Sequence, residues 1–88
     1  MNILKFPLHH QDVGAVVVAT LSGVESDVFL VDPPNLRSLE HGAAFHYHGG
    51  HYKRSPVRLH VPSSGDWTAV VIPGSGGTVR ASVRVIAA

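Results

Sequence analysis

The sequence predicts an all-β domain, a small antiparallel β-sandwich or barrel of about seven strands with one short helical turn near residues 35–40. Short valine-rich runs recur at a spacing of about 8–12 residues, and glycine- and proline-containing turns separate them. Several runs also alternate apolar with polar residues, which places successive side chains on opposite faces of a strand. No convincing amphipathic helix competes with this interpretation.

The first third of the chain contains three predicted strands. The alternating run 3–8 indicates an edge strand, because Pro7 cannot donate a hydrogen bond to a ladder. The nearly continuous apolar run 13–21 is typical of a strand covered on both faces or at the centre of a sandwich. A turn at Ser22–Gly23 leads to a third strand over 27–32, which is expected to pair with the second as a hairpin.

The middle of the chain interrupts this pattern. The consecutive prolines 33–34 must break the ladder, and Asn35 is placed to cap a short helical turn over 36–40. The run 43–48 indicates a fourth strand, and the glycine pair 49–50 indicates a turn or a bulge.

The last three strands show the clearest pattern, over 57–61, 67–72 and 79–85. In the first and the last of them, valine, leucine or alanine occupies one face and polar side chains occupy the other. This alternation predicts that Arg80 and Arg84 face solvent while Val79, Ala81, Val83 and Val85 face the core.

Composition excludes several classes of protein. The chain has 88 residues, of which 44% are apolar and 15% charged, and it has no cysteine. These values exclude a disordered tail, a coiled coil, a disulfide scaffold and a thiolate metal site. So small a domain has a thin core, and a homodimer would bury additional apolar surface. No apolar run reaches the length of a signal-peptide core or a membrane span, so we expect a soluble, cytoplasmic, bacterial protein.

Positive charge is concentrated in the last third of the chain. Residues 1–52 carry two Lys and Arg against five Asp and Glu, whereas residues 53–88 carry five against one. If the strands share a sheet, their outward side chains could bind an acidic small molecule or an acidic protein partner. The alternative is that they keep a sheet surface soluble, and so few charges argue against nucleic acid. The candidate binding residues are Lys53, Arg54, Arg58, His60, Arg80 and Arg84.

The seven histidines suggest a second hypothesis. His46 and His48 would share one face of the strand over 43–48, and His51 follows across the glycine pair. Three imidazoles could hold zinc or another divalent transition metal, as in a small cupin-like, metal-dependent enzyme. However, no carboxylate follows where a cupin-type site has one, and the nearest acid in the sequence is Glu40.

Other catalytic motifs are missing from the sequence. It has no Gly-x-Ser-x-Gly elbow, no phosphate-loop lysine after its glycine-rich segment and no carboxylate pair with acid–base spacing. The sequence therefore favours a non-catalytic domain without a metal or another cofactor over an enzyme.

Four segments together resemble a small bacterial family, the domain of unknown function eighteen-eighty-three, whose members occur alone or fused to TIR domains. These segments are Tyr47–Gly50, Ser55–Leu59, Val61–Trp67 and Val79–Val85. The resemblance covers almost the whole chain, so we expect one domain over 1–88. It implies a compact, mainly β domain with no established reaction, and the TIR fusions imply a module for recognition or self-association. Asp66 stands where the family frequently has a histidine.

Overall fold

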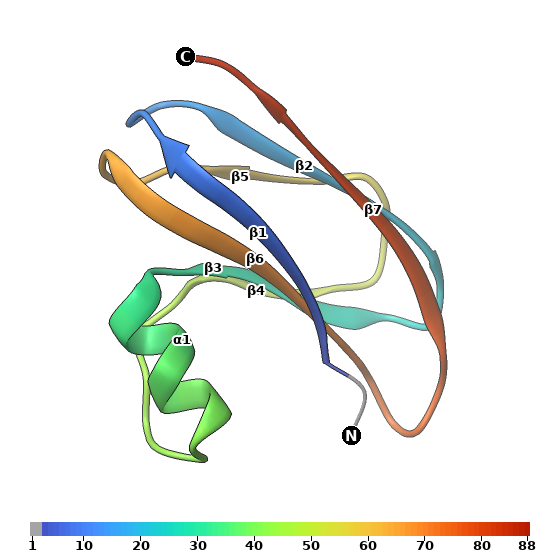
Figure 1. Ribbon diagram of the computed structural model, residues 1–88. Helices are drawn as coiled ribbons and strands as arrows, with labels where there is room; N and C mark the ends of the chain where they lie inside the picture. Colours follow the sequence, from blue (N-terminus) through green and yellow to red (C-terminus); the bar gives the residue numbers. More distant parts are fainter. Residues whose placement is uncertain (1–2) are drawn as a thin grey trace.

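The computed structural model describes residues 3–88, which form seven strands in two antiparallel sheets and one helix (Figure 1). The strand order is β1-β6-β3-β4 in one sheet and β5-β2-β7 in the other. The predicted all-β sandwich is confirmed, with two separate sheets in place of a closed barrel. The elements are β1 (Leu4–Gln11), β2 (Val16–Gly23), β3 (Ser26–Val31), α1 (Pro33–Glu40), β4 (His48–Tyr52), β5 (Val57–His60), β6 (Gly65–Pro73) and β7 (Val79–Ile86).

Most connections pass from one sheet to the other. In residues 3–88 the exception is the step from β3 to β4, which stay in one sheet with α1 between them. The predicted hairpin of the second and third strands is therefore wrong, because β2 pairs with β5 and β7 whereas β3 pairs with β4 and β6. The predicted turn at Ser22–Gly23 is also wrong, since β2 continues through Gly23.

Two hydrophobic clusters lie on the two faces of the four-stranded sheet. The larger cluster fills the space between the sheets and includes Val17, Leu30 and Trp67. A smaller cluster lies on the other face of the four-stranded sheet, where Phe29 packs with Leu36 of α1. The four-stranded sheet is therefore covered on both faces, as its almost continuous apolar strands β3 and β6 require. The helix α1 contacts β3 and β6, which belong to the four-stranded sheet. The sheet β5-β2-β7 is therefore covered only on the face that it turns toward the core.

The helix begins one turn earlier than predicted. Asp32 is its N-cap, and its carboxylate accepts hydrogen bonds from the Asn35 backbone N at 3.1 Å and from Asn35 Nδ2 at 2.8 Å. Asn35 is therefore not the cap, because Pro33 and Pro34 fit the first turn, where a backbone N–H has no partner within the helix. No helix among residues 3–88 is long and apolar enough to cross a membrane.

The fourth strand lies further along the chain than predicted. Residues 43–47 form a loop, and β4 starts at His48, so its two glycines lie within a ladder of regular register instead of forming a turn or a bulge. Gly49 has φ of +152°, and a Cβ there would lie 2.6 Å from the Cα of Phe29. Only glycine allows the two strands to approach so closely in this conformation.

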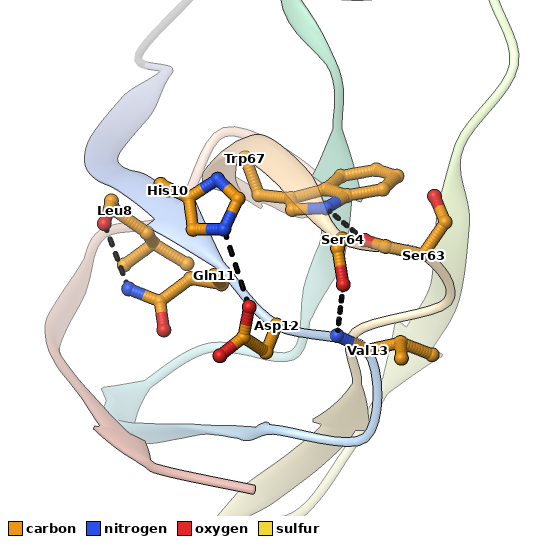
Figure 2. A network of polar contacts seen from close by, with 8 residues as sticks. All are labelled: Leu8, His10, Gln11, Asp12, Val13, Ser63, Ser64 and Trp67. Atoms are coloured by element: carbon orange, nitrogen blue, oxygen red, sulfur yellow. Dashed lines mark hydrogen bonds and ion pairs between the residues drawn. The ribbon is translucent and has the colours of Figure 1, made fainter.

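The turns at one end of the sandwich are fastened together (Figure 2). The backbone N of Val13, between β1 and β2, donates to Ser64 Oγ at 2.9 Å, between β5 and β6. Trp67 Nε1 donates to the Ser63 carbonyl at 2.8 Å. The backbone N–H of Val61 donates to the carbonyl of Ala15, in the connection between β1 and β2, at 2.8 Å. The segment Val61–Trp67 therefore has a structural role, which is to hold two turns together.

Candidate functional site

Three of the predicted binding residues are arginines that project from the uncovered face of the sheet β5-β2-β7. Arg58 on β5 and Arg84 on β7 both lie directly opposite Val18 on β2. Arg80 lies opposite Ser22, four residues further along β2. Residues directly opposite one another, and residues an even number apart, share a face of an antiparallel sheet. The condition set in the sequence analysis, that these strands share a sheet, is therefore met, and the three arginines lie on one face of it.

Val18 shows how two of these arginines are held. It is only 1% exposed, although it points away from the core that Val17 enters. Its neighbours in the same row are Arg58 and Arg84, both of them exposed, and we infer that their aliphatic stems cover Val18 while the guanidinium groups stay in water. The two arginine Cα atoms are roughly 10 Å apart, which is two strand spacings. His60 lies exposed beside them on β5.

The remaining predicted residues lie at two other places. Lys53 and Arg54 follow β4 and line, together with Arg58, a surface hollow of about 480 Å³. Arg80 lines a separate hollow of about 230 Å³, roughly 13 Å from Arg84 along β7. The structure therefore joins Lys53, Arg54, Arg58 and Arg84 into one region, which we call the basic face, and leaves Arg80 at its margin.

No cation of the basic face forms an ion pair within the described chain, although Glu25 lines a hollow together with Lys53 and Arg54. Strands β2, β5 and β7 contain three arginines and no carboxylate. The ion pairs among residues 3–88 involve Lys5, His10 and His51, so none involves a cation of the basic face. An incoming anion would therefore not have to displace an internal carboxylate.

The structure does not assemble the three candidate metal ligands. Among residues 3–88, no group of three or more His, Asp or Glu side chains is placed to hold a metal ion. His46 is exposed in the loop before β4, and His48 makes an edge contact with Trp67, with ring centroids 5.6 Å apart. His51 is three residues from His48 and therefore lies on the other face of β4. The shared strand face predicted for His46 and His48 is wrong, because the strand begins only at His48.

His51 has carboxylate partners instead. Its Nδ1 lies 2.8 Å from Asp27 Oδ1, and its Nε2 lies 3.4 Å from Glu25 Oε1. The hydrogen bond to Asp27, followed by the contact with Glu25, raises the pKa of His51 above its usual value of 6.5, although desolvation opposes this shift. The imidazolium is thus favoured between two carboxylates.

A further hollow lies on the helix side of the four-stranded sheet, where the sequence predicted no site. We call this cavity of about 320 Å³ the aromatic hollow, and its lining residues are Asp27, Phe29, Phe45, Tyr47, Gly50, His51 and Ile72. The rings of Phe29, Phe45 and Tyr47 contact one another, with centroids 5.2–5.7 Å apart. Phe29 is only 4% exposed, whereas Tyr47 is 52% exposed.

A hydrogen bond fastens the loop that carries two of these rings. The side-chain oxygen of Asn35 accepts from the backbone N of His46 at 2.8 Å, between Phe45 and Tyr47. Asn35 is itself held by the cap of α1. The alternation of Phe45 with Tyr47 predicted a strand, and only the packing of both rings on Phe29 reveals the hollow.

The comparison with protein families agrees with the resemblance noted in the sequence. Residues 1–88 match the family described as Domain of unknown function (DUF1883). No curated protein and no solved structure matches the chain. The family description states neither a reaction nor a ligand, so any function must be argued from the geometry.

Proposed function

The chain belongs to the DUF1883 family, and on that premise we propose that it is a non-catalytic recognition domain whose basic face binds an acidic group of a ligand or partner protein. One observation carries this proposal: Arg58 and Arg84 flank Val18 in a single row, on strands that contain no carboxylate. We expect this binding to take place in the bacterial cytoplasm.

The chemistry of the basic face suits a carboxylate or a phosphate. A guanidinium presents a planar fork of N–H donors that can bind either group through two hydrogen bonds. Because the stems of Arg58 and Arg84 already rest on Val18, less side-chain freedom is lost on binding than for freely moving arginines. The hollow beside Lys53 and Arg54 extends the same positive potential toward the loop after β4.

The test uses variants that remove charge without uncovering Val18. Replacing arginine by glutamine keeps most of the stem, so Arg58→Gln combined with Arg84→Gln should preserve the fold. We expect a fluorescein-labelled hexaglutamate peptide to bind the natural protein at low salt, measured by fluorescence anisotropy. The double variant should bind it at least tenfold more weakly, because two charge-assisted contacts are lost.

The matched control is Arg37→Gln, which removes one exposed arginine from α1, on the other side of the molecule. It should leave the affinity for the peptide unchanged. Equal binding by the double variant and the natural protein would refute the proposal, and so would no binding of the peptide at low salt. Steep salt dependence with a DNA oligonucleotide, and none with the peptide, would favour nucleic acid instead.

Self-association through a homodimer is a second form of the same non-catalytic role. The argument for it is the thin core expected at this chain length. Sedimentation velocity tests it, since a monomer at high micromolar concentration would contradict it.

A further inference from the structure

We propose that the aromatic hollow is a second binding site and that its ligand is a methylated ammonium group. The hollow lies on the helix side of the four-stranded sheet, whereas the basic face lies on the outer side of the other sheet. His51 lines this hollow and also the hollow beside Lys53 and Arg54, so the two sites are neighbours at that residue. The aromatic rings line only the first of these two hollows, and the proposal does not rest on the proposed function.

The aromatic rings supply the first part of the argument. Phe29, Phe45 and Tyr47 all line the cavity, and their rings are inclined to one another by 37–51°. The face of an aromatic ring carries partial negative charge and attracts a cation within about 6 Å of its centre. Phe29 comes from β3, and the other two rings come from the loop before β4, so the cavity has aromatic walls of different orientation.

Charge supplies the second part. Asp27 lines the hollow and Glu25 lies on the other side of His51, whereas no lysine or arginine is among the lining residues. Even with His51 protonated, these three side chains sum to −1 − 1 + 1 = −1. Lys53 and Arg54 share a neighbouring hollow with Glu25, so the carboxylate that lines the aromatic hollow itself, Asp27, is the group that attracts a cation there.

The apolar walls decide which kind of cation fits. A primary ammonium or a guanidinium carries several N–H donors, each of which loses water on entering the hollow and needs an acceptor. Asp27 is the one carboxylate among the lining residues, and the other walls include Phe29, Phe45 and Ile72. A methylated ammonium keeps the positive charge and presents methyl groups to these walls. A cavity of about 320 Å³ is at the small end of the range for small-molecule sites, about 300–1,000 Å³.

The loop that completes the hollow is held in place before any ligand arrives. Asn35 joins α1 to the backbone of His46, so Phe45 and Tyr47 are positioned on either side of a fixed point. Tyr47 is half exposed and lies at the rim, where its removal leaves the buried ring of Phe29 in the core. Preorganised aromatic rings lose little freedom on binding.

The experiment is a titration followed by amide chemical shifts in nitrogen-15 NMR spectra. The probes are tetramethylammonium chloride, choline and 3,3-dimethylbutan-1-ol, the last being a neutral isostere of choline. We expect choline to shift the amides of residues 27–29 and 45–51, with an affinity about tenfold higher than that of the neutral alcohol. Equal affinity for choline and the alcohol would overturn the proposal, as would shifts confined to other residues or no shift at 50 mM choline.

Variants assign the effect to the ring and to the charge. Tyr47→Ala should weaken choline binding about tenfold, whereas Tyr47→Phe keeps the ring and should bind as the natural protein does. At pH 5.5, where His51 is protonated in both proteins, Asp27→Asn should weaken choline and leave the neutral alcohol unchanged, because it removes one negative charge from the lining. An unchanged affinity in both Tyr47→Ala and Asp27→Asn would contradict the assignment.

Two further arms separate this site from the basic face and identify the source of the cation. The double variant Arg58→Gln, Arg84→Gln should bind choline normally, so a failure of the proposed function leaves this result intact. A peptide with one trimethyllysine, compared with its unmethylated form, shows whether the group can be carried by a protein. Stronger binding of the methylated peptide than of choline supports a protein source, and stronger binding of choline supports a free ligand.

Discussion

Replacing Gly49 by alanine should destabilise the domain by about 2–6 kcal/mol. The residue has φ of +152°, and holding an L side chain in such a conformation costs about 1–3 kcal/mol. The added Cβ would lie 2.6 Å from the Cα and 2.8 Å from the Cβ of Phe29, and it would also collide with the carbonyl oxygen of Val28. Overpacking of this kind costs a further ~1–3 kcal/mol. Together these terms approach the whole stability of a small domain, about 5 kcal/mol at the lower end.

Urea unfolding measures the loss, followed by circular dichroism and by the fluorescence of Trp67. The matched control is Gly50→Ala in the same strand, because no heavy atom lies within 4 Å of its added Cβ. This control should change the free energy of unfolding by less than about 1 kcal/mol, the ordinary range for glycine and alanine. If both variants unfold at the same urea concentration, the close approach of β4 to β3 does not require glycine, and the reasoning fails.

Three further predictions concern His51, the helix cap and the cover over Val18. NMR titration should give His51 a pKa above 6.5, and Asp27→Asn should lower it, since the hydrogen bond that His51 donates to the Asp27 carboxylate is the largest cause of the shift. Because folding raises the pKa of His51, its contact with Asp27 stabilises the fold below the unfolded pKa of about 6.5. This contribution disappears as pH rises through the folded pKa. The free energies of unfolding of the natural protein and of Asp27→Asn, measured in urea, should therefore differ more at pH 5.5 than at pH 9. Asp32→Ala should cost about 1 kcal/mol in thermal or urea unfolding, and Asp32→Asn, which can still cap, should cost less. Arg58→Ala should lower stability by about 1 kcal/mol by uncovering Val18, whereas Arg58→Gln should not, and equal stabilities would show that the stem contributes no cover.

Local alternation in the sequence was sufficient to predict the strands at both ends of the chain. Val79 and Val83 are half-buried against the main core while Arg80 and Arg84 are exposed, as their spacing indicates. The edge position of β1, which contains Pro7, is also confirmed. These features depend on neighbours along one strand, and a sequence records such neighbours directly.

Features that depend on distant contacts could not be predicted in this way. The pairing of β4 with β3 brings Gly49 close to Phe29, a residue twenty positions earlier in the chain. The pairing partners of β2 were missed because a short turn between two apolar strands indicates a hairpin, although here the chain passes between sheets. The helix start was missed because Asn35 is a good cap in isolation, whereas Asp32 precedes two prolines that suit the first turn.

The two candidate sites differ in the same respect. The outward orientation of Arg58 and of Arg84 could each be predicted from alternation along one strand, whereas only the fold shows that both strands belong to one sheet. The aromatic hollow draws its lining from β3, β4, β6 and a loop, between Asp27 and Ile72. Its signal in the sequence is a pair of aromatic residues at 45 and 47 without an obvious partner, and the partner became visible only in the fold.

The passage of the chain between sheets has a consequence for how this molecule folds. In residues 3–88, the hydrogen-bonded neighbours of β1 and β2 include β6 and β7, which come some sixty residues later. Closing such long loops before their contacts form is slow, so we expect folding in milliseconds to seconds instead of microseconds. On the ribosome, neither sheet can be completed until β6 and β7 have emerged. Until then β2 can pair only with β5 and β3 only with β4, so apolar surface of these strands remains exposed and we expect the nascent chain to be prone to aggregation.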